Sequence, residues 1–122
     1  MYELMVETHF AAAHQLRGYK GKCENLHGHN WRVQVVINAE KLNEIGLAID
    51  FHEFKSTISE FILSLDHSLL NEIFPFTELN PSSENIAKWL YDSINKKITN
   101  DNINVFSVTV WESETASATY YE

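Results

Sequence analysis

Alternating apolar and polar positions predict strands near both ends of the chain. From residue 2 to 14, one parity is mostly apolar and ends on a histidine: Tyr2, Leu4, Val6, Thr8, Phe10, Ala12 and His14. From 27 to 39 the alternation is cleaner, with one face formed by His27, His29, Trp31, Val33, Val35, Ile37 and Ala39. A period of two is typical of half-buried strands. We therefore predict two antiparallel strands joined by the glycine-containing loop 15–26.

The middle of the chain changes to a helical period. Asp50 with Glu53 three residues later resembles a capping box, and an apolar stripe follows at helical spacing: Phe51, Phe54, Ile58, Phe61, Ile62 and Leu65. This helix should end near Asp66. Ser82 and Ser83 are both N-cap candidates for a second helix, whose buried face would be Ile86, Trp89, Leu90 and Ile94.

Alternation returns over residues 103–112, where one parity carries Phe106, Val108, Val110 and Glu112, and residues 115–121 are a plausible last strand. The element order ββααββ predicts an α+β fold, with an antiparallel sheet and two helices on one face. The chain has 122 residues and no linker or repeat, so we expect a single domain over 1–122.

Composition narrows the classes of function. The net charge of −8 argues against a general nucleic-acid or anionic-membrane binder, and no apolar run approaches the roughly 20 residues that span a bilayer. One cysteine and no signal-peptide pattern favour a cytoplasmic protein. The basic residues Arg17, Lys20 and Lys22 are either a solvated loop or a phosphate-binding cluster. A core this small favours oligomerisation.

His27-Gly28-His29 is the most informative triplet for chemistry. On a strand, residues two apart point the same way at a separation of roughly 7 Å, so both imidazoles can converge on one ion. His14 ends the preceding strand on the apolar parity and is the best third ligand. Three histidines and an open position make a catalytic zinc site. The alternative is a chance pairing in a chain that has six histidines.

Other polar residues near these histidines allow more than one interpretation. Cys23 is a buried small hydrophobe, a thiolate base activated by a nearby cation, or a fourth metal ligand. Asp66-His67 is a surface pair or an oriented proton shuttle. Glu112 lies on an apolar strand face and would need a partner there, such as a ligand with paired N–H donors; Glu114 is its nearby competitor.

Six collinear blocks together resemble the 6-pyruvoyl-tetrahydropterin synthase family, which includes the 6-carboxytetrahydropterin synthases. The blocks are FAAAH at 10–14, CENLHGHNW at 23–31, IDFHEFK at 49–55, LDH at 65–67, NPSSENIAKWL at 80–90 and VWE at 110–112. The resemblance implies the tunnelling fold (T-fold). It also implies homo-oligomers, trimers or hexamers, with active sites between subunits.

The resemblance also implies a role for each matching residue. Zinc would bind His14, His27 and His29. Cys23 would be the proton-abstracting base, with Asp66 and His67 as a second acid/base pair. Glu112 would hold the amino-pyrimidine edge of the pterin, and the hydroxyls of Ser82 and Ser83 would contact the pterin or cap the helix.

The spacing C-x3-HGH resembles the carboxytetrahydropterin synthases of the queuosine pathway. The implied reaction converts 7,8-dihydroneopterin triphosphate to 6-carboxytetrahydropterin, releasing acetaldehyde and triphosphate. A pyruvoyl synthase, which eliminates triphosphate only, is the nearest alternative. Members with glutamate in place of the cysteine cleave dihydroneopterin-type substrates; Cys23 argues against this, but Glu24 lies beside it. A non-catalytic zinc-binding assembly module is the alternative from another class.

Overall fold

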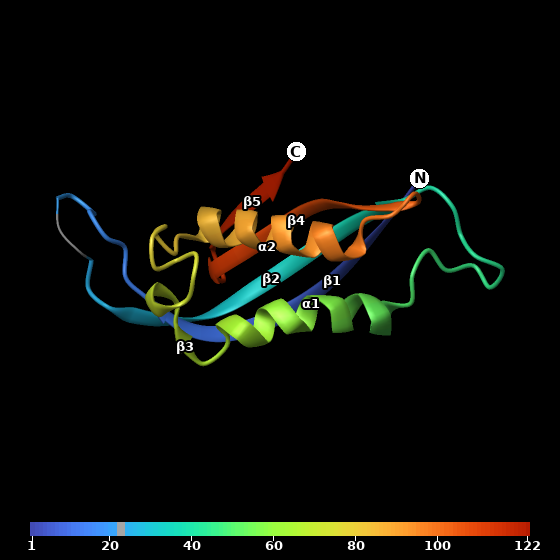
Figure 1. Cartoon of the computed structure of the whole chain (residues 1–122). Helices are drawn as coiled ribbons and strands as arrows, with labels where there is room; N and C mark the ends of the chain where they lie inside the picture. The colour runs from blue at the N-terminus through green and yellow to red at the C-terminus, as the bar shows by residue number, and fades with distance from the viewer. Residues whose placement is uncertain (22–23) are drawn as a thin grey trace.

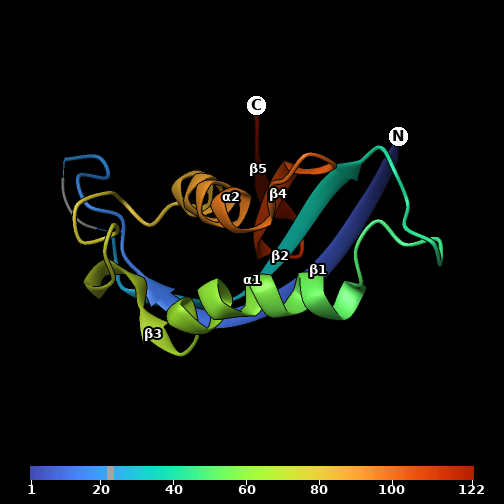
Figure 2. The ribbon, with the colours of Figure 1, turned by 45° about the vertical axis from the view of Figure 1, so that its right-hand side comes forward.

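The computed structural model describes residues 1–21 and 24–122. Its elements in chain order are β1 (Tyr2–His14), β2 (His27–Ala39), α1 (Phe51–Leu65), β3 (Ser68–Leu69), a 3-10 helix (Leu70–Glu72), α2 (Ser83–Ile98), β4 (Ile103–Ser113) and β5 (Ala116–Tyr121). Both long helices lie on the same side of the sheet (Figures 1 and 2). The predicted α+β architecture is confirmed. Neither long helix, nor any other in the described ranges, could cross a membrane.

The sheet has the strand order β3-β1-β2-β4-β5. β1 and β2 form the predicted antiparallel hairpin, in a register that runs without a break from Tyr2↔Ala39 to His14↔His27. The two-residue strand β3 pairs with β1 in parallel, so the sheet is mixed and not wholly antiparallel as the pattern predicted. A strand of two residues is too short to produce a periodic signal, which is why the sequence did not reveal it.

The core lies between the inner face of the sheet and the two helices. Its largest side chain is Trp31, which is fully buried, and α1 and α2 contribute the stripes that their periodicity predicted. Phe51 is the exception, because it is half-exposed at the first position of α1. Asp50 is the N-cap, as predicted, and accepts a hydrogen bond from the His52 backbone N–H at 2.7 Å, not from the N–H of Glu53 as in a capping box.

β4 carries a bulge that corrects one prediction. Val36 pairs with Ser107 but Ile37 pairs with Val105, so Phe106 is an extra residue in β4. Val105 is buried and Phe106 is 42% exposed. The prediction that Phe106 shares the buried parity is therefore wrong, because the bulge changes which parity faces the core.

Beyond this bulge, Val108, Val110 and Glu112 continue on the inner face, as predicted for those three residues. A second irregularity follows, because Trp111 pairs with Ser117 of β5 whereas Ser113 pairs with Ala116. Glu112 is the residue left without a β5 partner. Bulges of this kind redirect a side chain, and here the redirected side chain is a carboxylate.

Helix α2 begins at Ser83, and Ser82 is its N-cap. The Ser82 hydroxyl accepts a hydrogen bond from the Asn85 backbone N–H at 3.2 Å, while Ser83 is buried in the first turn. Of the two candidates from the sequence, Ser82 therefore caps the helix. Loss of such a cap costs about 1 kcal/mol.

We expect Ser82→Ala to lower the free energy of unfolding by about 1 kcal/mol and Ser82→Asp to restore it, because aspartate accepts the same N–H bond. Urea denaturation measured by circular dichroism tests this. Equal stability of Ser82→Ala and the unmodified chain would contradict the capping role.

Candidate metal centre and active site

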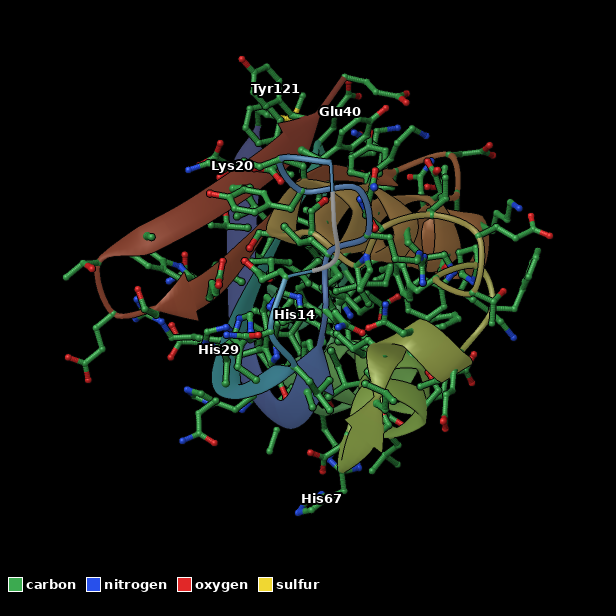
Figure 3. The ribbon with its side chains drawn as sticks, turned by 90° about the vertical axis from the view of Figure 1, so that its left-hand side faces the viewer. His14, Lys20, His29, Glu40, His67 and Tyr121 are labelled. Carbon is green, nitrogen blue, oxygen red and sulfur yellow. The ribbon has the colours of Figure 1, made fainter. Side chains whose placement is uncertain are left out.

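Four side chains converge where β1 ends and β2 begins. These are His14, His27, His29 and Glu112, whose donor atoms all lie within 4.8 Å of one another. Three of them come from the β1–β2 hairpin, in which His14 is opposite His27 and Ala12 is opposite His29. Figure 3 shows His14 and His29 at this end of the sheet. The structure therefore brings together the three predicted metal ligands and adds a carboxylate to them.

Backbone carbonyls orient two of the imidazoles. His14 Nδ1 is 2.7 Å from the Pro81 carbonyl, and His27 Nδ1 is 2.7 Å from the Asn25 carbonyl. A carbonyl only accepts hydrogen bonds, so each Nδ1 carries the proton and each Nε2 presents a lone pair. The two Nε2 atoms are 3.1 Å apart. Two ring nitrogens that face each other at this distance can share a proton or bind one metal ion between them.

His29 has the protonation state of a ligand. Burial lowers the pKa of its imidazole, with Glu112 opposing this effect and the two other histidines adding to it, so the ring is neutral at neutral pH. Its Nε2 is buried and makes no hydrogen bond, and Glu112 Oε1 lies 2.9 Å from it. An unpaired buried nitrogen that points at two other imidazoles fits a metal ligand.

The distances also fit a zinc ion. Bonds of about 2.1 Å at a tetrahedral angle place two ligand nitrogens about 3.4 Å apart, close to the observed Nε2 separation. A ring that donates its Nδ1–H to a carbonyl is held in the tautomer and orientation common to zinc-bound histidines. The residues present could therefore hold a metal, and three imidazoles with a carboxylate suit zinc.

Trp31 forms the floor of the cluster. Its ring lies 4.9 Å from the His14 ring and 5.1 Å from the His29 ring, measured between centroids. The indole N–H donates to the Ala12 carbonyl at 3.1 Å, and Phe10 stacks on the indole at 5.7 Å. The imidazoles are thus packed against the core on one side and face outward on the other.

Two asparagines fix the segment that follows His14. The Asn71 amide accepts from the Gln15 backbone N–H at 2.9 Å and donates to the Gln15 carbonyl at 2.7 Å. Asn80 makes the same pair of bonds with Arg17, both at 2.8 Å. The sequence did not reveal these residues, because an asparagine between two helices has no distinctive spacing. They hold the loop that leaves β1 close to the N-terminus of α2.

Arg17, one of the three residues of the basic cluster, makes structural contacts to the backbone. Its guanidinium donates to the carbonyls of Phe76 and Leu79, both at 2.7 Å. Lys20 lies over the ring of Tyr19, with 5.6 Å between Nζ and the ring centroid. Arg17 therefore ties two loops together, which is a use that neither sequence interpretation included.

Asp66 and His67 form an oriented pair. Asp66 Oδ1 accepts from the Ala11 backbone N–H at 2.8 Å, and Oδ2 lies 3.0 Å from His67 Nδ1. His67 adopts the left-handed region at φ 55°, and its backbone N–H donates to the Ala11 carbonyl. A non-glycine residue held in this region is a frequent feature of functional sites.

The His67 ring faces away from the three histidines of its own chain. Its side chain is 83% exposed, and Figure 3 shows it well apart from His14 and His29. The structure therefore does not bring Asp66 and His67 to the metal ligands within one chain. Sequence reasoning alone could not determine this, because the direction of a side chain at a helix end depends on the backbone dihedrals there.

The remaining residues considered for the site belong to the loop before β2. Cys23 and Lys22 lie outside the described residues. Glu24 has a buried Oε1 that makes no hydrogen bond, 3.8 Å from His27 Nδ1. The Glu24 backbone is held from both sides, because its N–H donates to the Leu16 carbonyl and its carbonyl accepts from the Gln15 amide at 2.7 Å.

The Asp66 contact predicts a pH dependence of stability. Chiefly the Ala11 N–H holds the pKa of the Asp66 carboxyl below its ordinary value of 3.8. A depressed pKa means that the stabilisation is complete above pH 3.8 and is lost as the pH falls through the folded-state pKa. We expect Asp66→Asn to lower Tm near neutral pH, and the deficit to shrink in acid.

Thermal unfolding of Asp66→Asn and of the unmodified chain at about pH 7 and about pH 3 measures the change in this deficit. Glu78→Gln is the control, because Glu78 is exposed. A Tm deficit of Asp66→Asn that stays constant over this range would contradict the assignment.

A search against protein families finds one match that spans nearly the whole sequence. The model of the 6-pyruvoyl tetrahydropterin synthase family matches residues 3–122. The 6-carboxy-5,6,7,8-tetrahydropterin synthase of Synechocystis sp. is 32% identical over 126 residues, covering 99% of this chain and 94% of that protein. The dihydroneopterin monophosphate aldolase of Pyrococcus furiosus is 31% identical over 109 residues, covering 89% and 88%.

Among solved structures, the 6-pyruvoyl tetrahydropterin synthase of Caenorhabditis elegans superposes with a TM-score of 0.85. The superposition covers 99% of this chain and 95% of that chain, at 24% sequence identity. The same fold is therefore present in both proteins.

Proposed function

The chain belongs to the 6-pyruvoyl tetrahydropterin synthase family, and from this premise we propose a specific reaction for it. The proposed enzyme is a zinc-dependent lyase that converts 7,8-dihydroneopterin triphosphate and water to 6-carboxy-5,6,7,8-tetrahydropterin, acetaldehyde and triphosphate, as a step of queuosine biosynthesis. The observation that carries the proposal is the trio of imidazole nitrogens that face one another at the end of the hairpin. The name of the Synechocystis relative supports the product.

We propose that His14, His27 and His29 hold the zinc ion. When bound, zinc supplies Lewis acidity that lowers the pKa of the substrate side-chain hydroxyls. The Pro81 and Asn25 carbonyls keep the lone pairs of His14 and His27 directed at one point, and Trp31 excludes water from behind them.

Proton transfer is assigned to two groups. The proposed base is the Cys23 thiolate, which takes a proton at the carbon that joins the side chain to the ring. His67, held by Asp66 through Nδ1, presents Nε2 for the hydroxyl protons. Glu112, on the inner face of β4, is proposed to accept hydrogen bonds from the amino-pyrimidine edge, while Ser82 and Ser83 lie at the start of α2 as candidate pterin contacts.

Because His67 points away from its own metal ligands, we propose that it serves the site of a neighbouring copy. This supports a homo-oligomer, a trimer or a hexamer, with active sites between subunits. We further propose that residues 1–122 act as a single domain in the cytoplasm, on the composition of the sequence.

Mass spectrometry of the products of 7,8-dihydroneopterin triphosphate tests the reaction, with metal analysis of the same sample. We expect acetaldehyde and triphosphate in equal amounts. Triphosphate without acetaldehyde would instead identify a pyruvoyl synthase. An unchanged substrate in the presence of fully zinc-loaded protein would exclude both synthases, leaving the non-catalytic zinc-binding module or an enzyme for a different pterin.

Glu24 supports a second candidate, an aldolase that cleaves dihydroneopterin or its monophosphate. Its buried Oε1 makes no hydrogen bond, and the Pyrococcus relative carries the name of such an aldolase. Cys23→Ala and Glu24→Gln form a matched pair of variants that separate the two candidates. We expect Cys23→Ala to keep zinc and lose turnover by about 100-fold or more, and Glu24→Gln to keep most of it. The opposite result with dihydroneopterin as substrate would favour the aldolase.

Subunit mixing tests the shared site. His29→Ala and His67→Ala should each be inactive alone, because each removes one half of every site. After the two proteins are unfolded together and refolded, random assembly should restore roughly one quarter of the unmodified activity. No recovery, in mixed oligomers verified by mass spectrometry, would contradict a site between subunits.

A further inference from the structure

The position of Glu112 suggests a role that the sequence interpretation did not include, because its carboxylate lies among the three histidines. Its Oε1 lies 2.9 Å from His29 Nε2, 3.9 Å from His14 Nε2 and 4.0 Å from His27 Nε2. The same oxygen is therefore close to all three imidazole nitrogens. A carboxylate whose only role is to bind the edge of the pterin would not need to lie close to all three nitrogens.

The charges of these groups also require a common partner. The Nε2 atoms of His14 and His27 present lone pairs, since their Nδ1 atoms donate to carbonyls. The Nε2 of His29 is buried and makes no hydrogen bond. An anionic oxygen among three such nitrogens is repelled by them unless a cation lies between. A divalent cation would satisfy all four ligand atoms at once.

The backbone directs the carboxylate to this point. Glu112 shares the inner face of β4 with Val108 and Val110, and it is the residue that the β4–β5 pairing leaves out. Its neighbour Glu114 is exposed beyond the end of β4. Of these two carboxylates, which compete for one role at the sequence level, only Glu112 belongs to the cluster with the histidines.

We propose that Glu112 is the fourth ligand of the metal in the substrate-free enzyme, completing a sphere of three nitrogens and one oxygen. The ligation itself is independent of the reaction. It deepens the proposed function because the same carboxylate is assigned to the pterin edge, so that substrate and metal would compete for Glu112. The metal centre would then be closed at rest and open only when substrate draws Glu112 away.

The experiment uses the full chain, freed of metal and titrated with Zn²⁺ against a chelator of known affinity. Removal of a ligand should weaken zinc binding by about 10-fold or more in Glu112→Ala and Glu112→Gln. Glu114→Gln is the matched control and should bind zinc as the unmodified chain does. His29→Ala serves as the reference for loss of a ligand, and circular dichroism of each variant verifies the fold.

Co²⁺ in place of Zn²⁺ separates ligation from simple charge attraction, because its visible absorption reports the number and kind of ligands. We expect the spectrum to change in Glu112→Gln and to stay the same in Glu114→Gln. Unchanged zinc affinity in Glu112→Gln, or weaker affinity with an unchanged cobalt spectrum, would overturn the proposal. Neither readout depends on turnover, so a protein that ligates metal through Glu112 but does not process the pterin would refute only the proposed function.

Discussion

The antiparallel register of β1 against β2 determines the site more than any other feature of the molecule. It places His14 opposite His27 and Ala12 opposite His29, with every inner side chain of both strands on one face. A slip of one residue would turn one strand's histidines to the opposite face. The same alternation that buries Val33 and Val35 therefore also brings the imidazoles together, so the forces that form the core also form the candidate metal centre.

The centre is a polar extension of this core. Trp31 contacts the histidines with its ring edges and the backbone with its N–H, and it is fully buried. The carbonyls of Pro81 and Asn25 hold two rings in the tautomer that a metal needs. Pro81 directly precedes the cap of α2, so the orientation of His14 depends on where this helix starts.

Sequence periodicity predicted the hairpin, the two helices and the three histidines, because each involves regular spacing on a strand or a helix. It also placed Glu112 correctly on the inner face of β4. The same alternation placed Phe106 on that face, which is wrong because Phe106 is exposed. The bulge at Phe106 and the strand β3 could not be predicted, since both depend on pairing between distant segments. Asn71 acts through its amide on the backbone of a distant loop, and a contact of this kind leaves no periodic pattern.

The direction of His67 was unpredictable for a related reason. Its left-handed backbone and its bond to Ala11 are set by the crossing from α1 to β3, and they turn the ring outward. In the proposed assembly, this pair would contribute to a site that another copy completes. Oligomerisation would then be a requirement of the chemistry and not only a way to cover apolar surface.

The two irregularities of β4 bracket a short piece of strand from Phe106 to Glu112. Side chains alternate between the two faces of the sheet from the first bulge onward. This alternation determines which face the carboxylate of Glu112 occupies at the second bulge. The number of residues between the two bulges therefore determines which side chain faces the histidines. Insertion or deletion of one residue there would leave the strand able to pair, yet would exchange Glu112 for a neighbour on the inner face. In related chains, substitutions within this segment should therefore be tolerated far more readily than insertions or deletions.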